Sequence, residues 1–190
     1  MKRIFIAIKV DPGPGIKSMM SDLSSSLSGD RIKWTDMSNI HLTLVFLGDI
    51  EEKRIKTLAM LVAEACSSAV SFDIEVRGTG VFGKKADPKV IRAGIEKSGA
   101  LENLYSLVTA ALLKGGFMSD TKPFRPHITL GRIRSVKDTG RLYEVTGKYA
   151  DTIFQNIKVG EVIIFESILR PEGPLYKPVS KVSLKQNKQV

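Results

Sequence analysis

The sequence has little of several residue types, and each shortage excludes a class of protein. A single cysteine, Cys66, in 190 residues excludes an internal disulfide framework and is typical of a reducing compartment. No apolar run is long enough to cross a membrane, and the run after the basic start is too short for a signal peptide. We therefore expect a cytoplasmic protein that has no membrane association.

Histidine is equally scarce, and both histidines stand in the same sequence context. They begin the segments His41-Leu42-Thr43-Leu44 and His127-Ile128-Thr129-Leu130. Successive side chains of a β-strand point to opposite faces, so each histidine shares a face with its threonine. Each motif thus predicts a polar His–Thr pair on a strand whose other face belongs to the core.

Acidic residues are fewer than basic ones, 20 against 29, which gives a formal charge of +9. Clustered Lys and Arg attract phosphate and steer a polyanion toward a protein. The composition favours a partner such as nucleic acid, although a merely solvated basic surface would have the same composition.

The order of predicted elements indicates an internal duplication, approximately residues 1–86 and 87–184. Each unit opens with an apolar strand, continues through an amphipathic helix and reaches a histidine strand, with Trp34 in a connector of the first unit. Strands alternating with helices predict an α+β fold, here a single bilobal domain over 1–190 with a frayed tail at 185–190. Besides the histidine strands, we expect strands over 4–10, 71–76, 81–82, 90–95, 153–159, 162–165 and 179–184, and helices over 16–27, 50–67, 100–114 and 138–149.

Two histidines, one in each lobe, suit acid–base chemistry if the motif strands face each other across a cleft. In-line displacement at phosphorus uses a proton acceptor on one side and a proton donor on the other. Imidazole fills either role because its unperturbed pKa is about 6.5. The hydroxyls of Thr43 and Thr129 can donate hydrogen bonds to phosphate oxygens. This scheme predicts a phosphodiester-cleaving site that needs no metal and no cofactor.

The histidines could instead have a structural or a metal-binding role. Each could be a structural residue of the core, but the matched pair argues against this. A metal site would need a carboxylate or thiol at ligand spacing, which the sequence does not offer, and threonine is a weak zinc ligand.

The two H-x-T-x motifs resemble those of the two-histidine (2H) phosphoesterase superfamily, and within it the RNA 2′,3′-cyclic phosphodiesterase or 2′-5′ RNA ligase (LigT/ThpR) family. The resemblance spans nearly the whole chain and implies duplicated α/β units whose antiparallel sheets line a central cleft. It rests on segments 3–8, 41–48 and 124–132 and on Ser167, Gly173 and Tyr176 near the end.

The resemblance also implies a role for each motif residue. His127 would be the proton acceptor that activates water, and His41 would be the proton donor to the departing ribose oxygen, which leaves a 2′-phosphate. The sequence itself does not fix this direction, since two similar histidines are interchangeable until their surroundings differ. Thr43 and Thr129 would bind the phosphate, and Arg132 would add a bidentate cation.

Further substrate contacts are expected around the motifs. Strand alternation could direct Arg125 into the cleft, although Pro126 disturbs that geometry. Trp34, beside Lys33, could stack a base at the rim. Three phenylalanines lie in apolar strand patterns typical of the core: Phe5, Phe46 and Phe82.

The expected substrate is RNA that ends in a 2′,3′-cyclic phosphate, such as a tRNA fragment, with reverse 2′-5′ joining as a second reaction of the same site. One alternative is an RNA-end-binding protein in which catalysis is incidental. Another is the same chemistry on small cyclic nucleotides or 2′-5′ oligonucleotides. A monomer is expected because a cleft within one chain needs no partner subunit.

Overall fold

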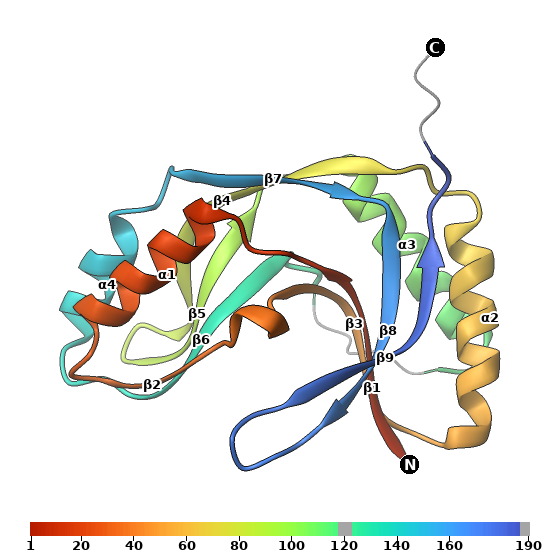
Figure 1. The fold of residues 1–190 in the computed structure, drawn as a ribbon, viewed down its shortest axis with the longest axis horizontal. Coiled ribbons are helices and arrows are strands. Elements are labelled where there is room, and N and C mark those ends of the chain that lie inside the picture. Colours follow the sequence, from red (N-terminus) through yellow and green to blue (C-terminus); the bar gives the residue numbers. More distant parts are fainter. Residues whose placement is uncertain (118–122, 187–190) are drawn as a thin grey trace.

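The computed structural model describes residues 1–117 and 123–186 and has an α+β fold. Within these residues, one antiparallel sheet curls between two pairs of helices (Figure 1), which confirms the predicted fold class. The strands are β1 (Lys2–Lys9), β2 (Arg31–Trp34), β3 (His41–Ile50), β4 (Phe72–Lys84), β5 (Asp87–Ile95), β6 (His127–Ser135), β7 (Ile153–Val159), β8 (Glu161–Ile168) and β9 (Leu175–Ser183). The helices are α1 (Pro14–Ser26), α2 (Ile55–Cys66), α3 (Gly99–Lys114) and α4 (Thr139–Gly147), and short 3₁₀ turns cover Met37–Asn39 and Glu52–Arg54.

The two histidine strands are neighbours in the middle of the sheet. The strand order is β7-β4-β5-β6-β3-β1-β8-β9, and β2 pairs with the outer part of β6. β3 and β6 are joined by a single residue pair, Leu42 opposite Ile128. This junction divides the sheet into a β6 half-sheet (β6, β5, β4, β7 and β2) and a β3 half-sheet (β3, β1, β8 and β9).

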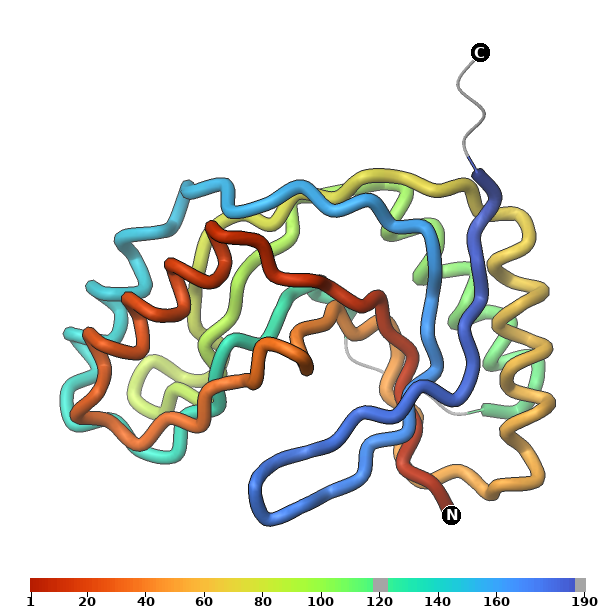
Figure 2. Tube along the Cα trace, viewed as in Figure 1, coloured from red at the N-terminus to blue at the C-terminus, as the bar shows by residue number. Residues whose placement is uncertain are grey.

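Each half-sheet carries its own pair of helices. α1 and α4 pack on the β6 half-sheet, and α2 and α3 pack on the β3 half-sheet (Figures 1 and 2). Since α1 follows β1 and α3 follows β5 along the chain, each of these helices crosses to the half-sheet opposite its preceding strand. Each lobe therefore contains elements from both halves of the sequence.

The helix ends follow signals in the sequence. Pro14 occupies the first turn of α1, where its missing N–H costs no hydrogen bond. The side chains of Ser98 and Asp138 cap α3 and α4 by accepting hydrogen bonds from backbone N–H groups. α3 ends at Gly115 and Gly116, where Gly116 has a φ of 67°.

The apolar face of both motifs lies in the core, between the sheet and the helices. Leu42, Leu44, Ile128 and Leu130 are at most 4% exposed and pack in one cluster with residues of all four described helices. Burying each such side chain stabilises the fold by about 1.5–3 kcal/mol. The His–Thr face of β3 and β6 is consequently the face that the helices leave open.

Several element ends differ from the predicted ones: the helix expected over 50–67 is α2, which begins at Ile55 after a 3₁₀ turn, and the strand expected over 179–184 is β9, which begins at Leu175. The structure differs further at three places. Segments 71–76 and 81–82 are parts of one strand, β4, because a register shift between Arg77 and Thr79 accommodates Gly78, whose φ is 68°. Trp34 belongs to β2 rather than to a connector. The backbone of Lys185 still pairs with Ala69 and Ser71, while 187–190 of the predicted tail lie outside the described residues.

Candidate active site

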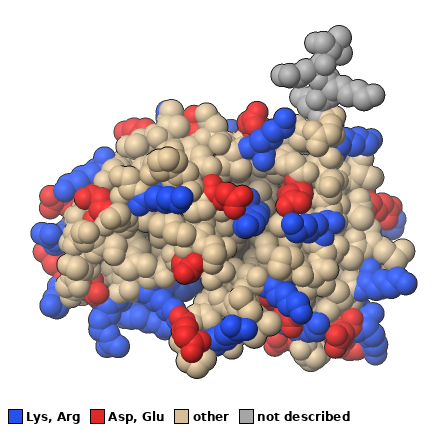
Figure 3. All heavy atoms as spheres, in the orientation of Figure 1, with Lys and Arg blue, Asp and Glu red and all other residues tan. Residues whose placement is uncertain are grey.

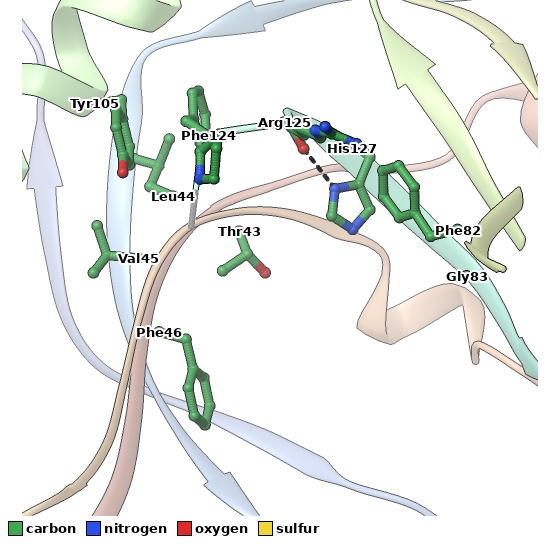
Figure 4. A pocket seen from close by; sticks show the side chains of 11 residues that line it. Thr43, Leu44, Val45, Phe46, Phe82, Gly83, Tyr105, Phe124, Arg125 and His127 are labelled. Carbon is green, nitrogen blue, oxygen red and sulfur yellow. Dashed lines mark hydrogen bonds between the residues drawn. The ribbon is translucent and has the colours of Figure 1, made fainter. Parts of the chain in front are cut away.

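The register at the sheet junction brings the two motifs together. With Leu42 opposite Ile128 in an antiparallel pair, Thr43 lies opposite His127 and His41 lies opposite Thr129. All four polar side chains are half-buried on the open face, as strand alternation predicts. Figure 4 shows the Thr43 hydroxyl and the His127 ring directed into the same space. Each imidazole thus stands beside the hydroxyl of the other motif.

The same backbone contact orients both imidazoles. Nδ1 of His41 lies 2.6 Å from the carbonyl oxygen of Asn39, and Nδ1 of His127 lies 2.7 Å from that of Arg125. A carbonyl oxygen only accepts, so each Nδ1 is the protonated nitrogen that donates. Nε2 of each ring is thereby left as the atom that can exchange a proton with a substrate.

Aromatic rings hold each imidazole from the side. The His41 ring lies 5.1 Å from Phe5 and 5.1 Å, edge-on, from Tyr176. The His127 ring meets Phe82 edge-on at 4.8 Å. These contacts leave little room for either ring to turn away from the carbonyl that its Nδ1 is bonded to.

The surroundings of both histidines favour the neutral form. Burial lowers the pKa of His41 most, and Arg132 and His127 lower it further, while the bond to Asn39 raises it. Burial also lowers the pKa of His127 most, and there the added positive charges are Arg92 and Arg132. Two arginines thus lower the pKa of His127, and one arginine lowers the pKa of His41.

A β-bulge in each motif strand changes which side chains share the histidine face. The register of β3 with β1 shifts at Leu44, and that of β6 with β5 shifts at Leu130. Without the shift Arg132 would point to the helix side, but it is exposed while Ile133 is buried. Phe46 reaches the open face in the same way. The two motif strands therefore differ in the residue presented after the bulge, aromatic on β3 and cationic on β6.

Sequence analysis missed Arg92, which lies opposite Thr129 on β5. Its guanidinium lies 4.9 Å from the centre of the Phe82 ring. Alternation puts Arg92 on the face opposite the buried Ile91 and Ala93, which is ordinary for a half-solvated strand, so the sequence held no specific signal for this residue.

The remaining predicted substrate residues occupy different surroundings. Arg125 is exposed and lines a cavity beside His127. Trp34 packs against the core, with its ring over Gly131, and lines neither cavity described below. Of the phenylalanines expected in the core, Phe5 is buried, but Phe46 and Phe82 are not, because they line the open face.

Two cavities adjoin the histidines. The larger, about 480 Å³, lies on the Thr43–His127 side and has mostly apolar walls, among them the stacked rings of Tyr105 and Phe124, 4.0 Å apart (Figure 4). The smaller, about 250 Å³, lies beside His41 and is more polar, with Lys9 and Lys181 at its edge. Aromatic walls of the larger cavity suit a planar base, since base–aromatic stacking is sequence-tolerant.

The face seen in Figure 3 carries Lys and Arg side chains interspersed with Asp and Glu, in a sequence with 29 basic and 20 acidic residues. Within residues 1–117 and 123–186 no three His, Cys, Asp or Glu side chains gather as a possible metal-binding group. No helix in this part of the chain is long and apolar enough to span a membrane.

Comparison with known proteins extends the similarity to the whole chain. The family described as LigT like Phosphoesterase matches residues 6–92 and 94–176. The RNA 2′,3′-cyclic phosphodiesterase of Archaeoglobus fulgidus is 31% identical over 176 residues, which cover 92% of this chain and 96% of that protein. That of Thermotoga maritima is 33% identical over 177 residues, 92% of this chain and 91% of that protein.

Solved structures show the same fold. A Thermus thermophilus protein of 25% identity superimposes with a TM-score of 0.78 over 97% of this chain and 98% of that one. Escherichia coli LigT complexed with 3′-AMP gives a TM-score of 0.73 at 21% identity, over 97% and 99% of the two chains. Both H-x-T-x motifs fall within the matched segments, which cover most of the sequence, so the chain belongs to the LigT-like phosphoesterase family.

Proposed function

We propose that the protein is a phosphodiesterase that opens the 2′,3′-cyclic phosphate at the end of an RNA and leaves a 2′-phosphate. The observation that carries this proposal is the facing pair of His–Thr motifs, each with its Nδ1 tied to a backbone carbonyl. The relatives from Archaeoglobus fulgidus and Thermotoga maritima, which bear the name of this activity, support it.

In the proposed mechanism, the proton passes through the two Nε2 atoms. Nε2 of His127 takes a proton from water as the water oxygen attacks phosphorus, and the bond from phosphorus to O3′ breaks. Nε2 of His41 gives its proton to O3′, which leaves a 3′-hydroxyl and a 2′-phosphate. Transfer of a proton from His127 to solvent, and from solvent to His41, completes the cycle.

The distribution of positive charge supports this direction. Nearby positive charges favour the neutral form of an imidazole, which is the form that a base needs. Arg92 and Arg132 both lower the pKa of His127 in this way. Of these two arginines only Arg132 lowers the pKa of His41, which burial and His127 lower as well. The difference in arginines agrees with the roles that the resemblance of the motifs implies, so we assign the acceptor role to His127 and the donor role to His41.

The remaining side chains of the site bind the substrate in this proposal. Thr43 and Thr129 donate to the non-bridging oxygens, and Arg132 lies where it can neutralise their charge next to either histidine. The larger cavity takes the terminal nucleoside against its aromatic walls. A stacking role for Trp34 stays a prediction.

The proposal includes several properties of the protein as a whole. It works as a cytoplasmic monomer without metal or cofactor, its substrates include ends of tRNA fragments, and the reverse reaction joins such an end to a 5′-hydroxyl through a 2′-5′ bond. We also propose that units 1–86 and 87–184 are two copies of one duplicated segment. The recurrence of a strand, a helix, a histidine strand and a second helix in each unit supports this.

Hydrolysis of a short RNA with a 2′,3′-cyclic end, in EDTA, tests the proposal. Loss of the general acid or of the general base lowers the reaction rate about 10²- to 10⁴-fold. The rates of His41→Ala and His127→Ala should therefore each be lower by that factor. ³¹P NMR should show a 2′-monoester as the product.

The competing function, an RNA-end-binding protein, makes the opposite prediction. Binding needs the hydroxyls and cations and not proton transfer, so His41→Asn and His127→Asn would bind the cyclic end as the wild type does. Tight binding without turnover in the wild type would contradict the phosphodiesterase.

A further inference from the structure

Arg92 has a buried polar atom that the proposed reaction does not use. Within residues 1–117 and 123–186, Nε of Arg92 is buried and has no hydrogen-bond partner. A buried, unpaired polar group costs free energy, and a charged one costs more. Burial and the nearby Arg125 both lower the pKa of Arg92, so its surroundings lack the negative charge that would compensate it.

The fold nevertheless holds this guanidinium in one place. A Cβ added at Gly80 would lie 3.3 Å from one terminal nitrogen of Arg92, and one added at Gly94 would lie 3.0 Å from the other. The group is therefore laid over the backbone of two glycines and against the Phe82 ring at 4.9 Å. A side chain fixed without a partner is preorganised for a ligand.

Arg92 does not stand where the reacting phosphate would be. It lies on β5, on the side of β6 away from β3, and so on the side of His127 away from His41. The charge of Arg92 lowers the pKa of His127 and is not among the causes that lower the pKa of His41, whereas Arg132 lowers both. Arg132 thus has the position expected for the phosphate between the histidines, and Arg92 is offset from it.

Arg125 supplies a second cation at the same place. Its side chain lines the larger cavity beside His127, and its charge acts on Arg92. Neither arginine forms an ion pair with a carboxylate within the described part of the chain. Two close guanidinium groups repel each other, and a shared phosphate would remove that repulsion through charge-assisted hydrogen bonds.

We propose that Arg92 and Arg125 form a second phosphate site, which binds the 5′-phosphate of the terminal nucleotide. This rests on the proposed function, because the terminal nucleotide of such an RNA has one other phosphate, at its O5′. The larger cavity would hold the nucleoside between the two phosphates. The enzyme would then select RNA ends over nucleoside 2′,3′-cyclic phosphates, which lack the second phosphate.

The test compares cytidine 2′,3′-cyclic phosphate with the same compound carrying a 5′-phosphate. The 5′-phosphate should raise kcat/KM of the wild type about tenfold or more, the effect of hydrogen bonds to a charged group. Arg92→Met and Arg125→Met should each bring the ratio of kcat/KM for the two compounds close to one. This ratio is the readout, because the charge of Arg92 also acts on His127 and its loss changes the rate on both compounds. Arg141→Met is the control that should keep the gain, because that guanidinium donates to the Ser26 carbonyl near the C-terminal end of α1.

Binding measurements test the second phosphate site independently of the reaction. Cytidine 2′-phosphate and cytidine 2′,5′-bisphosphate should differ in Kd by a similar factor, and only the two site variants should lose the difference. Arg125 is exposed, so its variant tests the site even if Arg92→Met unfolds. Absence of a gain in the wild type, or equal losses on both substrates, would overturn the second site; a binding gain without any turnover would retain it and overturn the proposed activity.

Discussion

Asn39 holds His41 through its backbone and the β8–β9 hairpin through its side chain. Its carbonyl accepts from Nδ1 of His41 at 2.6 Å, and its Nδ2 donates to the carbonyl of Pro174 at 2.9 Å. The turn that contains Asn39 is itself capped by Asp36, which accepts from the N–H of Ser38. The orientation of His41 is thus connected to a hairpin far away in the sequence.

Removing that side chain should affect His41 specifically. In Asn39→Ala the bond to Pro174 is lost, a hydrogen bond worth about 0.5–1.5 kcal/mol, so we expect kcat to fall about 2- to 10-fold with a smaller change in KM. Asn39→Asp should not restore it, since a carboxylate cannot donate to a carbonyl. Asn156→Ala, at an exposed position on β7, is a suitable control. Unchanged kcat in Asn39→Ala would mean that the hairpin does not influence His41.

The titration of the two histidines can be followed directly, because the chain has no others. Burial and arginines lower the pKa of both, so both NMR transitions should lie below 6.5. A positive charge disfavours imidazolium, so Arg92→Met should raise the pKa of His127 without raising that of His41. Arg132→Met should raise both. A higher pKa of His41 in Arg92→Met would contradict the placement of Arg92.

The same shifts determine the sign of the pH dependence. The donor must be protonated and the acceptor neutral, so kcat/KM should decline as pH rises through the pKa of His41, with a midpoint below 6.5. The decline should move to higher pH in Arg132→Met. Rates that stay constant from about pH 5.5 to about pH 8 would exclude His41 as an obligatory donor in the free enzyme.

The threonines should act through their hydroxyls alone. Thr43→Val and Thr129→Val keep the side-chain shape and remove a donor to the charged phosphate, for which we expect losses of about 10- to 100-fold in kcat/KM. Thr→Ser at either position should retain most activity. Steady-state kinetics on the cyclic-ended RNA, with thermal unfolding as a control for stability, gives the comparison.

Cys66 should be unreactive in the folded protein. Its side chain is fully buried in α2, and burial raises the pKa of the thiol to about 11. At pH 8 only about one thiol in a thousand is then thiolate, the form that reacts. Alkylation by iodoacetamide should be slow in buffer and fast in guanidinium chloride. Fast modification of the native protein would show that α2 opens locally.

The motifs predicted the centre of the site because they follow the strand period. Alternation alone places His41 with Thr43 and His127 with Thr129, and the opposite face of each motif is buried. The side of Arg132 was not predictable, since strict alternation puts position 132 with the core, and only the bulge at Leu130 reverses it. A bulge depends on the pairing of two strands, which a single segment does not reveal.

Residues contributed by other strands were less accessible to sequence analysis. Arg92 joins the site because β5 pairs with β6, and Gly80 and Gly94 leave room for its side chain. These positions are separated in the sequence and come together only through register. The surroundings of Trp34 also depend on register, because pairing of β2 with β6 places its ring over Gly131, while its stacking role stays a prediction.

The residue pair between β3 and β6 is not the sole link between the half-sheets, and this has a mechanical consequence. β7 of one half-sheet runs into β8 of the other through Gly160, whose carbonyl accepts from the N–H of Leu184 after β9. The half-sheets are therefore joined at the Leu42–Ile128 pair and again at Gly160, so they do not swing apart about a single hinge. The spacing between proton donor and proton acceptor is held by both connections.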